Sequence, residues 1–537
     1  MRSPEAVGLA SGLYTVAAIR RIESSLLAQY APGTLMRRAA AAVAAQATRM
    51  LRTLPADTTV VLLVGPGNNG GDALLAGRLL IESGFAVRAC AFETILRQAP
   101  IPQDAAAAWR AWHADGLSLL SLFDRSAWQT QRPPLVIDGL FGIGLSRPLP
   151  AEMTPLIAWL KRSRAQVLAI DVPSGIDADS GAAIAGGPVV PATVTVTMIA
   201  DKPGLHTGPG LAAAGNVRIA ALVDTPDSAP AGLGPVEASS PPSTLAIRGV
   251  RADAVLLDEA TVPRLLPARS VNAHKGTSGD VLIVGGRLGM AGAARLAARG
   301  ALGAGAGRVS IASDARSSDA ADPRRPEIMR AMVAATDPIP TRFKVVAIGC
   351  GLGQDQQAWQ YLRSVIASRA LMICDADALN LLAVTPELVR LVRQRSAPTI
   401  LTPHPLEAAR LLDLPTGRVQ SDRIGAACAL ARRFNAIAVL KGAGSVVADP
   451  QNHFAINASG NPVLATGGTG DVLAGVIAAL AAGTLGGVGS TAATAACAGV
   501  WLHGAAADLA ARHLGPAGVP AGRIADWLPA VFRYCRR

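Results

Sequence analysis

Short apolar runs alternate with longer Ala/Leu-rich stretches along the first half of the chain. The runs are β-branched or continuously apolar, and they cover residues 59–64, 86–92, 135–138, 167–171, 193–199 and 216–223. Apolar runs of this length between helical stretches are typical of parallel strands that are buried on both faces. The pattern therefore predicts an α/β domain built on a mostly parallel sheet.

The alternation stops near residue 224 and resumes at residue 249. The segment between is rich in Pro, Ser and Ala and has no periodicity, which is typical of a linker. Strand candidates in the second half are residues 281–284, 309–312, 345–348, 371–374, 399–401 and 438–440. We therefore expect a first domain over 1–225, a linker over 226–248 and a second α/β domain over 249–537. Ligands of such domains bind at the carboxyl ends of the strands.

Length and charge narrow the classes of partner. A chain of 537 residues is too long for one hydrophobic core, which supports two domains. The formal net charge is +12, which makes nucleic acid a candidate partner. Only five residues are lysines, however, the arginines are scattered, and the densest patch, 161–164, has no aromatic residue between its charges. We therefore expect no nucleic-acid partner.

Cysteine spacing and hydropathy bear on the compartment. The six cysteines form no CxxC pair, so we expect free thiols in a reducing, cytoplasmic compartment. Residues 1–23 contain no compact apolar core of the kind a signal peptide needs. Residues 472–507 are free of Asp, Glu, Lys and Arg and are long enough to span a membrane. They are rich in Ala, Gly and Thr and are interrupted by glycines at 483–489, so we predict two buried helices instead.

A glycine-rich turn, Gly-Pro-Gly-Asn-Asn-Gly-Gly-Asp at 65–72, follows the first predicted strand. It leads into a helical stretch, and a helix N-terminus is a seat for phosphate. Two further strands end at Asp138 and at Asp171, and Ser174 follows the second. Amide, carboxylate and hydroxyl oxygens at one sheet edge suit an alkali or alkaline-earth cation. The alternative is that these aspartates cap helices or turns.

The first half resembles the NAD(P)H-hydrate epimerases over nearly its whole length, through residues 67–72, 138–148, 171–175 and 201–204. The resemblance implies that potassium is bound by Asn69, Asp138 and Ser174, and that Asp171 is catalytic and contacts the substrate. Lys202 either enters this site or lies on the surface. The residues implied to bind the hydrated nicotinamide nucleotide are Asn68, Asn69, Gly70, Gly71, Asp72, Gly142, Ile143, Gly144, Leu145, Ser146, Arg147, Pro148 and Asp171.

The second half carries a series of motifs at 272–279, 285–286, 290–294, 349–353, 375–380, 402–407, 441–445 and 467–471. The last is Gly-Gly-Thr-Gly-Asp before a helical stretch. Phosphoryl transfer needs a base beside the acceptor hydroxyl and donors for the transferred group. Asp471 is the candidate base, and the N–H groups of Gly468, Thr469 and Gly470 are the candidate anion hole. Asp375 and Asp377 precede a helix predicted to start at Ala378, and we expect at least one of them to cap it.

Order and spacing of these motifs resemble the ribokinase-like fold and, within it, the ADP-dependent NAD(P)H-hydrate dehydratases, from about residue 250 onward. The resemblance implies substrate contacts at Ala293, Gly353, His404 and Asp471, and ADP as co-substrate with Mg²⁺. It implies nucleotide binding by Lys441, Gly442, Ala443, Gly444, Ser445 and Gly470. Cys350 stands where this family usually has Pro, and Ser445 where it usually has Thr.

Together the motifs predict an α/β chain with a Rossmann-like three-layer N-terminal domain and a ribokinase-like C-terminal domain. The predicted function is repair of hydrated NADH and NADPH, by epimerisation of the R and S hydrates and ADP-dependent dehydration of the S hydrate. We expect small-molecule substrates, no membrane partner and a homo-oligomer. One alternative is a vitamin or sugar kinase with a regulatory N-terminal domain. Another is a non-catalytic N-terminal module that binds RNA or protein.

Overall fold

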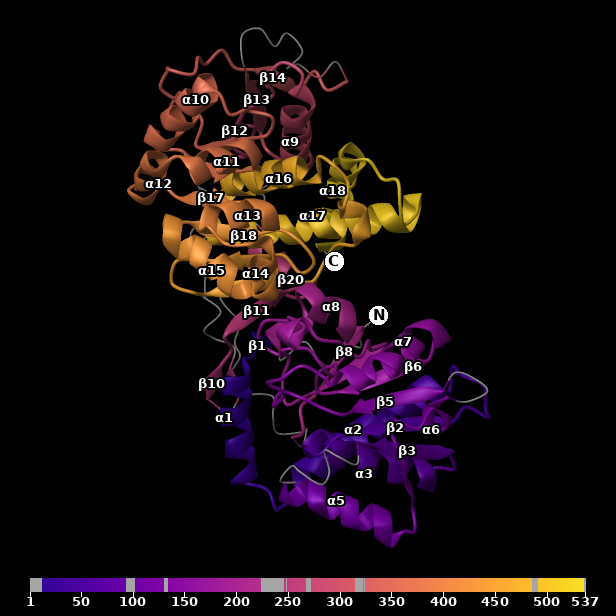
Figure 1. The fold of residues 1–537 in the computed structure, drawn as a ribbon. Helices are drawn as coiled ribbons and strands as arrows, with labels where there is room; N and C mark the ends of the chain where they lie inside the picture. Colours follow the sequence, from indigo (N-terminus) through magenta and orange to yellow (C-terminus); the bar gives the residue numbers. More distant parts are fainter. Residues whose placement is uncertain are drawn as a thin grey trace. The chain divides into compact units, whose positions relative to one another are not determined.

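A computed structural model describes residues 12–92, 102–129, 134–223, 246–247, 249–266, 272–313, 322, 324–484 and 491–535 (Figure 1). By its internal contacts the chain divides into two compact units. Described residues up to Asp253 belong to the first unit, and those from Ala254 onward to the second. The predicted linker, 226–248, lies outside the described residues apart from 246–247.

The first unit is built on a parallel sheet in the order β4-β3-β2-β5-β6-β7-β8. Its central strands are continuous apolar runs that are buried on both faces, as the sequence predicts. The strands of this unit are β1 (Gly12–Leu13), β2 (Val60–Val64), β3 (Val87–Ala91), β4 (Leu119–Ser121), β5 (Leu135–Gly139), β6 (Gln166–Ile170), β7 (Val194–Met198), β8 (Asn216–Ala220), β9 (Ala246–Ile247) and β10 (Val250–Arg251).

Helices cover both faces of this sheet, which makes three layers. One apolar cluster joins α2, α3 and α5 to the sheet, and another joins α6 and α7 to its opposite face (Figure 1). The helices of the unit are α1 (Val16–Leu27), α2 (Thr34–Leu51), α3 (Asn68–Glu82), α5 (Gln103–Ala114), α6 (Arg125–Trp128), α7 (Thr154–Ser163) and α8 (Gly208–Ala214).

The sheet of the first unit changes direction between β2 and β5. The chain adds β3 and β4 on one side of β2 and then crosses to form β5 on the other side. A crevice at such a switch point is where doubly wound sheets bind ligands. Backbones meet closely there, because a Cβ at Gly65 would lie 1.7 Å from the carbonyl oxygen of Leu140. Only glycine fits at that position.

The sheet of the second unit runs in the order β11-β20-β19-β18-β17-β16-β15-β12-β13-β14. Its pairs are parallel except for the antiparallel pairs β18–β19 and β19–β20. The strands are β11 (Ala254–Leu257), β12 (Asp280–Val284), β13 (Arg308–Ala312), β14 (Ile328–Arg330), β15 (Val345–Ile348), β16 (Leu371–Cys374), β17 (Thr399–Leu401), β18 (Ile437–Leu440), β19 (Val446–Ala448) and β20 (Phe454–Asn457).

Two helical layers cover this second sheet. One apolar cluster packs α9, α16, α17 and α18 on one face, and a second packs α10 to α13 with α15 on the other (Figure 1). The helices are α9 (Ala291–Gly303), α10 (Gln356–Ala367), α11 (Ala376–Val384), α12 (Pro386–Arg393), α13 (Pro405–Leu412), α14 (Thr416–Ser421), α15 (Arg423–Phe434), α16 (Thr469–Thr484), α17 (Ala492–Leu514) and α18 (Ala521–Cys535).

The uncharged stretch 472–507 forms most of α16 and the first part of α17, as predicted. Both helices pack into the core of the second unit. The glycine-rich connection at 485–490 lies outside the described residues. Among the helices that the structure describes, none combines the length and hydropathy that crossing a membrane requires.

Candidate functional sites

A buried carboxylate lies at the end of β5 in the first unit. Asp138 is fully buried, and both of its oxygens accept hydrogen bonds from Ser174, from the backbone N–H at 2.9 Å and from Oγ at 2.7 Å. The N–H of Leu140 donates a third bond at 3.3 Å. Burial raises the pKa of Asp138 to about 6, although these hydrogen bonds lower it in part. In the described part of the chain all donors to Asp138 are neutral. A bound cation would therefore stabilise the ionised form of this buried carboxylate.

Asn69 lies against the loop that follows β5. Its Nδ2 donates to the carbonyl of Ile170 at 2.8 Å, at the end of β6, and among the described residues no donor bonds its Oδ1. A Cβ at Gly142 would lie 2.7 Å from this side-chain amide, so the loop passes directly over it. The structure thus brings Asn69 to the loop between Asp138 and Gly142, and Ser174 joins from the end of β6.

Asp171 forms a buried ion pair that the sequence left undecided. Lys202 is fully buried, and its Nζ lies 2.8 Å from Asp171 Oδ1. The same ammonium donates to Thr197 Oγ1 at 2.7 Å and to the carbonyl oxygens of Met198 and Ala200 at 3.0 and 3.2 Å. Lys202 therefore belongs to the site and does not lie on the surface. The Lys202 ammonium group is thus a buried positive charge that four oxygen atoms hold in place.

The backbone of Asp171 adopts a left-handed conformation with φ of 69°. Such a conformation is uncommon for a residue other than glycine and clusters at functional sites. It turns the chain sharply after β6, and Oδ1 of Asp171 also accepts from the N–H of Met198 at 3.1 Å. The carboxylate is thus held from two sides at the sheet edge.

Further acids surround Asp171. Burial raises the pKa of Asp72 well above its usual range, and the charges of Asp171 and Glu23 raise it further. Burial and Asp171 likewise raise the pKa of Glu23. Glu23 comes from α1, outside every motif in the sequence, which is why pattern analysis missed it. Neighbouring carboxyl groups with perturbed pKa values are typical of sites that carry out acid–base chemistry.

The remaining predicted substrate residues of the first unit line the same edge with different exposure. Asn68 begins α3 and is exposed, whereas Gly70 and Gly71 are buried. Gly144, Ser146, Arg147 and Pro148 are exposed, and Gly142, Ile143 and Leu145 are half-buried. The 142–148 segment is therefore an accessible rim beside the buried carboxylates.

In the second unit, charged groups converge at the ends of β16, β17 and β18. Lys441 Nζ lies 2.7 Å from Asp375 Oδ1 and 3.9 Å from Glu407 Oε2. Burial lowers the pKa of Lys441, but Asp375 and Glu407 outweigh it, so the net direction is upward and the ammonium stays charged. Asp375 occupies the N-cap position of α11, which starts at Ala376, but its side chain makes no capping bond. The position agrees with the expectation that one of the two aspartates caps this helix, although the helix starts two residues before Ala378. The Asp375 carboxylate pairs with Lys441 instead of bonding the helix N–H groups, and Asp377 accepts from the N–H of Gly353.

Asp471 lies in the first turn of α16, beside this ion pair. Ligand atoms of Asp471, Asp375 and Cys350 all lie within 4.8 Å of one another. Burial raises the pKa of Asp471 to about 6, with a further rise from Asp375 and opposing effects from a hydrogen bond with Cys350 and from Lys441. The carboxylate is thus a stronger base than an exposed aspartate and remains mostly ionised at neutral pH.

The turn before Asp471 faces the same place. A Cβ at Gly470 would lie 3.2 Å from Lys441 Nζ, so the N-terminus of α16 directly adjoins the ammonium group. Of the three predicted anion-hole donors, the N–H of Thr469 already has a partner, the carbonyl of Thr466 at 3.4 Å. That distance is near the limit of a hydrogen bond, so the donor can be redirected to a ligand at small cost.

His404 begins α13 as its N-cap. Its Nδ1 accepts from the N–H groups of Leu406 and Glu407 at 3.1 and 3.3 Å, and the Glu407 side chain accepts from the N–H of His404 at 2.8 Å. This is a capping box with histidine in the place of Ser or Thr. The ring remains 46% exposed, and its Nε2 lies 3.4 Å from Glu407 Oε1 in the first turn of the same helix. The same side chain can therefore cap a helix and present part of its ring to a ligand.

The segment 441–445 forms a tight turn after β18. Oγ of Ser445 accepts from the N–H of Gly442 at 3.3 Å and lies 3.1 Å from the carbonyl of the same glycine. Arg423 lies buried behind this turn and donates to the carbonyls of Leu440 and Lys441 at 3.3 and 3.2 Å. Arg423 lies in no motif, yet it fixes the turn from behind.

Gly353 and Ala293 lie at the loop that follows β15. The N–H of Gly353 donates to Asp377 Oδ2 at 2.8 Å. A Cβ at Gly351 would lie 3.2 Å from that of Ala293 and 2.7 Å from the carbonyl of Met290. The loop after β15 thus packs on the start of α9. It reaches from Cys350, beside Asp471, to Gly353.

Comparisons with known proteins identify the family. Residues 32–204 match the family model described as YjeF-related protein N-terminus, and residues 281–530 match the one described as NAD(P)H-hydrate dehydratase. The bifunctional NAD(P)H-hydrate repair enzyme Nnr of Coxiella burnetii is 38% identical over 473 residues, which cover 88% of this chain and 89% of that protein. The chain belongs to the bifunctional NAD(P)H-hydrate repair enzymes.

Other members of the family agree with this assignment. The Nnr enzyme of Escherichia coli K12 is 36% identical over 474 residues, with 88% of this chain and 84% of that protein covered. A crystal structure of the ADP/ATP-dependent NAD(P)H-hydrate dehydratase from Bacillus subtilis, co-crystallised with ATP and Mg²⁺, is 32% identical. It covers 52% of this chain and 98% of its own, with a TM-score of 0.47. The relatives and the two family models confirm the family predicted from the sequence, and the two mainly parallel sheets agree with the predicted α/β class.

Proposed function

We propose that this chain carries out two consecutive steps on hydrated NADH and NADPH. The first unit interconverts the R and S hydrates, and the second dehydrates the S hydrate at the expense of ADP. Family membership over most of the chain supports both activities. The observation that carries the second step is the cluster of Asp471, Lys441 and Asp375 at the N-terminus of α16.

In the second unit, Asp471 accepts the proton of the substrate hydroxyl. The hydroxyl oxygen bonds the terminal phosphorus of ADP, and the phosphorus–oxygen bond to AMP breaks. Phosphate then leaves the ring carbon with its bonding electrons, a proton is lost from the neighbouring carbon, and the dihydronicotinamide double bond re-forms. Lys441 and the N–H groups at the start of α16 stabilise the negative charge on the transferred group. The 441–445 turn holds the adenine nucleotide, and His404 contacts the substrate through Nε2.

In the first unit, Asp171 is the group that moves protons at the hydrated ring. Lys202 is a positioning residue, because it is sealed from solvent and holds the Asp171 carboxylate in one orientation. Asp72 is a neighbouring acid whose raised pKa favours its protonated form. The rim at 142–148 and Asn68 bind the nucleotide portions of the substrate.

Potassium fits the donor set of the first unit. A buried carboxylate without a cationic partner in the described residues, a free amide oxygen and a hydroxyl are hard ligands of the type that alkali ions prefer. Asp138, Asn69 and Ser174 would hold the ion, which would supply positive charge near the bound substrate. The second unit offers Mg²⁺ carboxylate oxygens only, since the Cys350 thiol is not a magnesium ligand. There Mg²⁺ would be held chiefly by the phosphates of ADP.

All six cysteines are unpaired, which supports the proposed cytoplasmic setting.

The alternative of a vitamin or sugar kinase uses the same base and anion hole, so the reaction product must distinguish the two functions. Separated R and S hydrates are incubated with ADP, and the absorbance of reduced nicotinamide and the release of AMP are measured. Repair yields both signals from the S hydrate at once and from the R hydrate after epimerisation.

Asp471→Asn tests the assignment of the base. The variant should lose the dehydration signal. It should still convert R hydrate to S hydrate, because epimerisation takes place in the first unit and Asp471 lies in the second. A phosphorylated alcohol that accumulates without the reduced nicotinamide would instead favour the kinase. Dehydration that continues at the wild-type rate in Asp471→Asn would contradict the assigned base.

A further inference from the structure

One face of α17 contacts the segment 458–468, which leads from β20 into α16. Helices α16 and α17 pack side by side in the core of the second unit (Figure 1). Trp501, Gly504 and Asp508 are spaced three and four residues apart, so they share one face of α17. The segment ends at the proposed anion hole, the N–H groups of residues 468–470. None of the predicted site residues lies on α17.

The chain just before this segment and its first residues contact the backbone of α17 directly. Oγ of Ser459 donates to the carbonyl of Trp501 at 2.8 Å. A Cβ at Gly504 would lie 2.8 Å from the carbonyl carbon of Ser459, so a larger residue at 504 would push the segment away. The N–H of Asn457 donates to the carbonyl of Ser445 at 2.9 Å, in the proposed nucleotide-binding turn. The start of the segment is thus fixed both to α17 and to that turn.

Asp508 holds the middle of the segment. Its two carboxylate oxygens accept from the N–H of Gly460 at 2.9 Å and from Nδ2 of Asn461 at 2.7 Å. Asn461 in turn caps the short 3₁₀ helix Pro462–Leu464 through its Oδ1. The last carbonyl of that helix accepts from Oγ1 of Thr469 at 2.9 Å. A chain of hydrogen bonds therefore connects the Asp508 carboxylate with the first residue of α16.

Thr469 is held more firmly by its side chain than by its own N–H. Its Oγ1 lies 2.9 and 3.0 Å from the carbonyl oxygens of Leu464 and Thr466. Its N–H donates to the carbonyl of Thr466 at 3.4 Å, near the limit of a hydrogen bond. When this N–H turns to a ligand, Oγ1 can therefore keep the start of α16 in place.

We propose that Asp508 is a positioning residue for phosphoryl transfer, which acts through Asn461 and Thr469 to aim the anion-hole N–H groups at the transferred group. The inference rests on the proposed dehydration and extends it. In the described part of the chain, Asp508 bonds only residues 460 and 461, so it acts through the segment. Anion-hole donors stabilise charge that develops in the transition state, so their aim governs kcat more than the binding of ADP.

The test measures kcat and the KM for ADP at saturating S hydrate, from the reduced nicotinamide formed. Removal of one anion-hole donor lowers kcat by about 100- to 1000-fold, and a misaligned donor costs less. Asp508→Ala should therefore lower kcat by about three- to tenfold and change the KM for ADP by less than about twofold. Thr469→Val keeps the N–H but loses Oγ1, and it should lower kcat by about tenfold.

The double variant Asp508→Ala/Thr469→Val tests whether Asp508 acts through Thr469. If it does, the double variant should have the kcat of Thr469→Val alone, because the same hydrogen-bonded path is already broken. Losses that multiply in the double variant would overturn the proposal. A raised KM for ADP with an unchanged kcat in Asp508→Ala would also overturn it.

Asp449→Ala is the matched control for activity. Asp449 accepts from the N–H groups of Gln451 and His453 at 2.9 Å, and it follows β19 at the end away from the nucleotide-binding turn. Asp449→Ala should leave kcat unchanged. A loss of kcat equal to that of Asp508→Ala would show an effect of general loosening and would contradict the assigned role.

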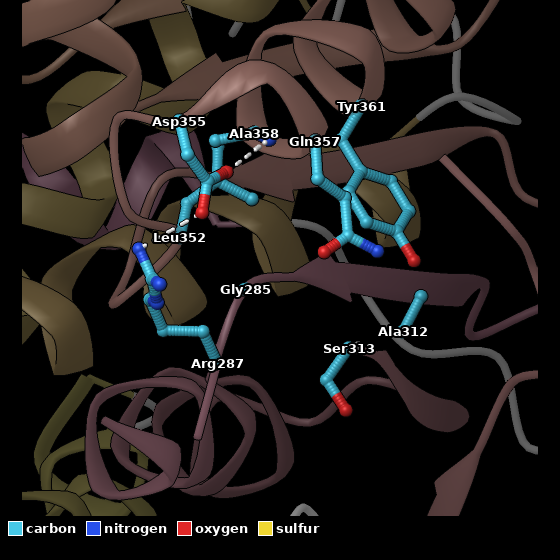
Figure 2. Close-up of a pocket in the computed structure, with 9 residues that line it drawn as sticks. All are labelled: Gly285, Arg287, Ala312, Ser313, Leu352, Asp355, Gln357, Ala358 and Tyr361. Carbon is cyan, nitrogen blue, oxygen red and sulfur yellow. Dashed lines mark hydrogen bonds and ion pairs between the residues drawn. The ribbon is translucent and has the colours of Figure 1, made fainter. Parts of the chain in front are cut away.

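Asp355→Ala is the comparison for stability. Asp355 also accepts from one backbone N–H, that of Ala358 at 3.0 Å, and pairs with one side chain, that of Arg287 at 3.2 Å (Figure 2). The two variants should lower the denaturation midpoint of the second unit by similar amounts. If Asp508→Ala lowers it far more, Asp508 holds the fold and the proposal fails. Wild-type protein that forms no reduced nicotinamide from either hydrate would instead refute the proposed function.

Discussion

Asp471→Asn should make the protein more stable at neutral pH while it removes dehydration. The folded protein holds the pKa of Asp471 at about 6, against the ordinary value of 3.8, mainly because of burial. A raised carboxyl pKa means that the folded state resists ionisation. The ionised group therefore lowers the stability of the fold above the folded pKa, and this penalty disappears as the pH falls toward the unfolded value.

The size of the effect follows from that difference in pKa. A difference of about two corresponds to up to about 3 kcal/mol at pH 7, since each pKa unit is worth about 1.4 kcal/mol. The penalty falls to less than about 1 kcal/mol near pH 4, where the folded carboxyl is protonated and the unfolded one is about half protonated. Asparagine keeps the shape of the side chain without the charge. The variant should therefore gain most of this energy at pH 7 and little of it at pH 4.

The measurement is chemical denaturation of both proteins at several pH values. Because the chain has two compact units, the transition of the second unit is identified as the one that ADP moves to higher denaturant. The reasoning is refuted if the variant gains the same stability at pH 4 as at pH 7, or if it is less stable at pH 7. Either result would mean that the buried charge of Asp471 does not lower the stability of the folded protein.

Three further predictions concern the same groups. The kcat/KM for dehydration should fall about tenfold from pH 7 to pH 5, as a base with a pKa near 6 is protonated, and Cys350→Ala should move this limb to higher pH by removing a hydrogen bond from Asp471; a limb that stays in place would contradict this role. Asp138→Ala should abolish conversion of R to S hydrate and leave dehydration of the S hydrate intact, measured with separated epimers. Epimerisation at the wild-type rate would contradict the proposed site. Lys202→Met should cost about 3 to 5 kcal/mol in denaturation, because it leaves Asp171 buried and unpaired, and Asp171→Asn in the same chain should restore stability but not epimerisation.

The sequence predicted the elements that are buried on both sides. The central strands β2, β5, β15 and β16 are continuous apolar runs, and their positions were predicted to within a residue or so. Short strands such as β11, β19 and β20 were missed. They are about as short as β15 and β16, so length alone does not explain the miss. β19 and β20 are antiparallel partners that only the folded sheet defines.

Site residues were predictable where a motif carries them. The motifs around Asp138 and Asp171 predicted two strand ends at one sheet edge, but sequence could not place Lys202, because its burial depends on oxygens at the end of β7 and just after it. At least one of Asp375 and Asp377 was predicted to cap a helix, since Asp before a helix usually does. Asp375 takes the N-cap position, but its carboxylate bonds elsewhere. Its pairing with Lys441 depends on which strands are neighbours in space.

The cap formed by His404 ties together two properties that are usually separate. Only a neutral imidazole can accept the N–H groups at the start of α13, so acid that protonates Nδ1 would release that turn. Burial lowers the pKa of His404, and the charge of Lys441 lowers it further. A lysine proposed to bind nucleotide therefore also protects a neighbouring helix start from acid. Any lineage that replaced this lysine would face an acid-sensitive turn next to its active site, even if nucleotide binding were recovered elsewhere.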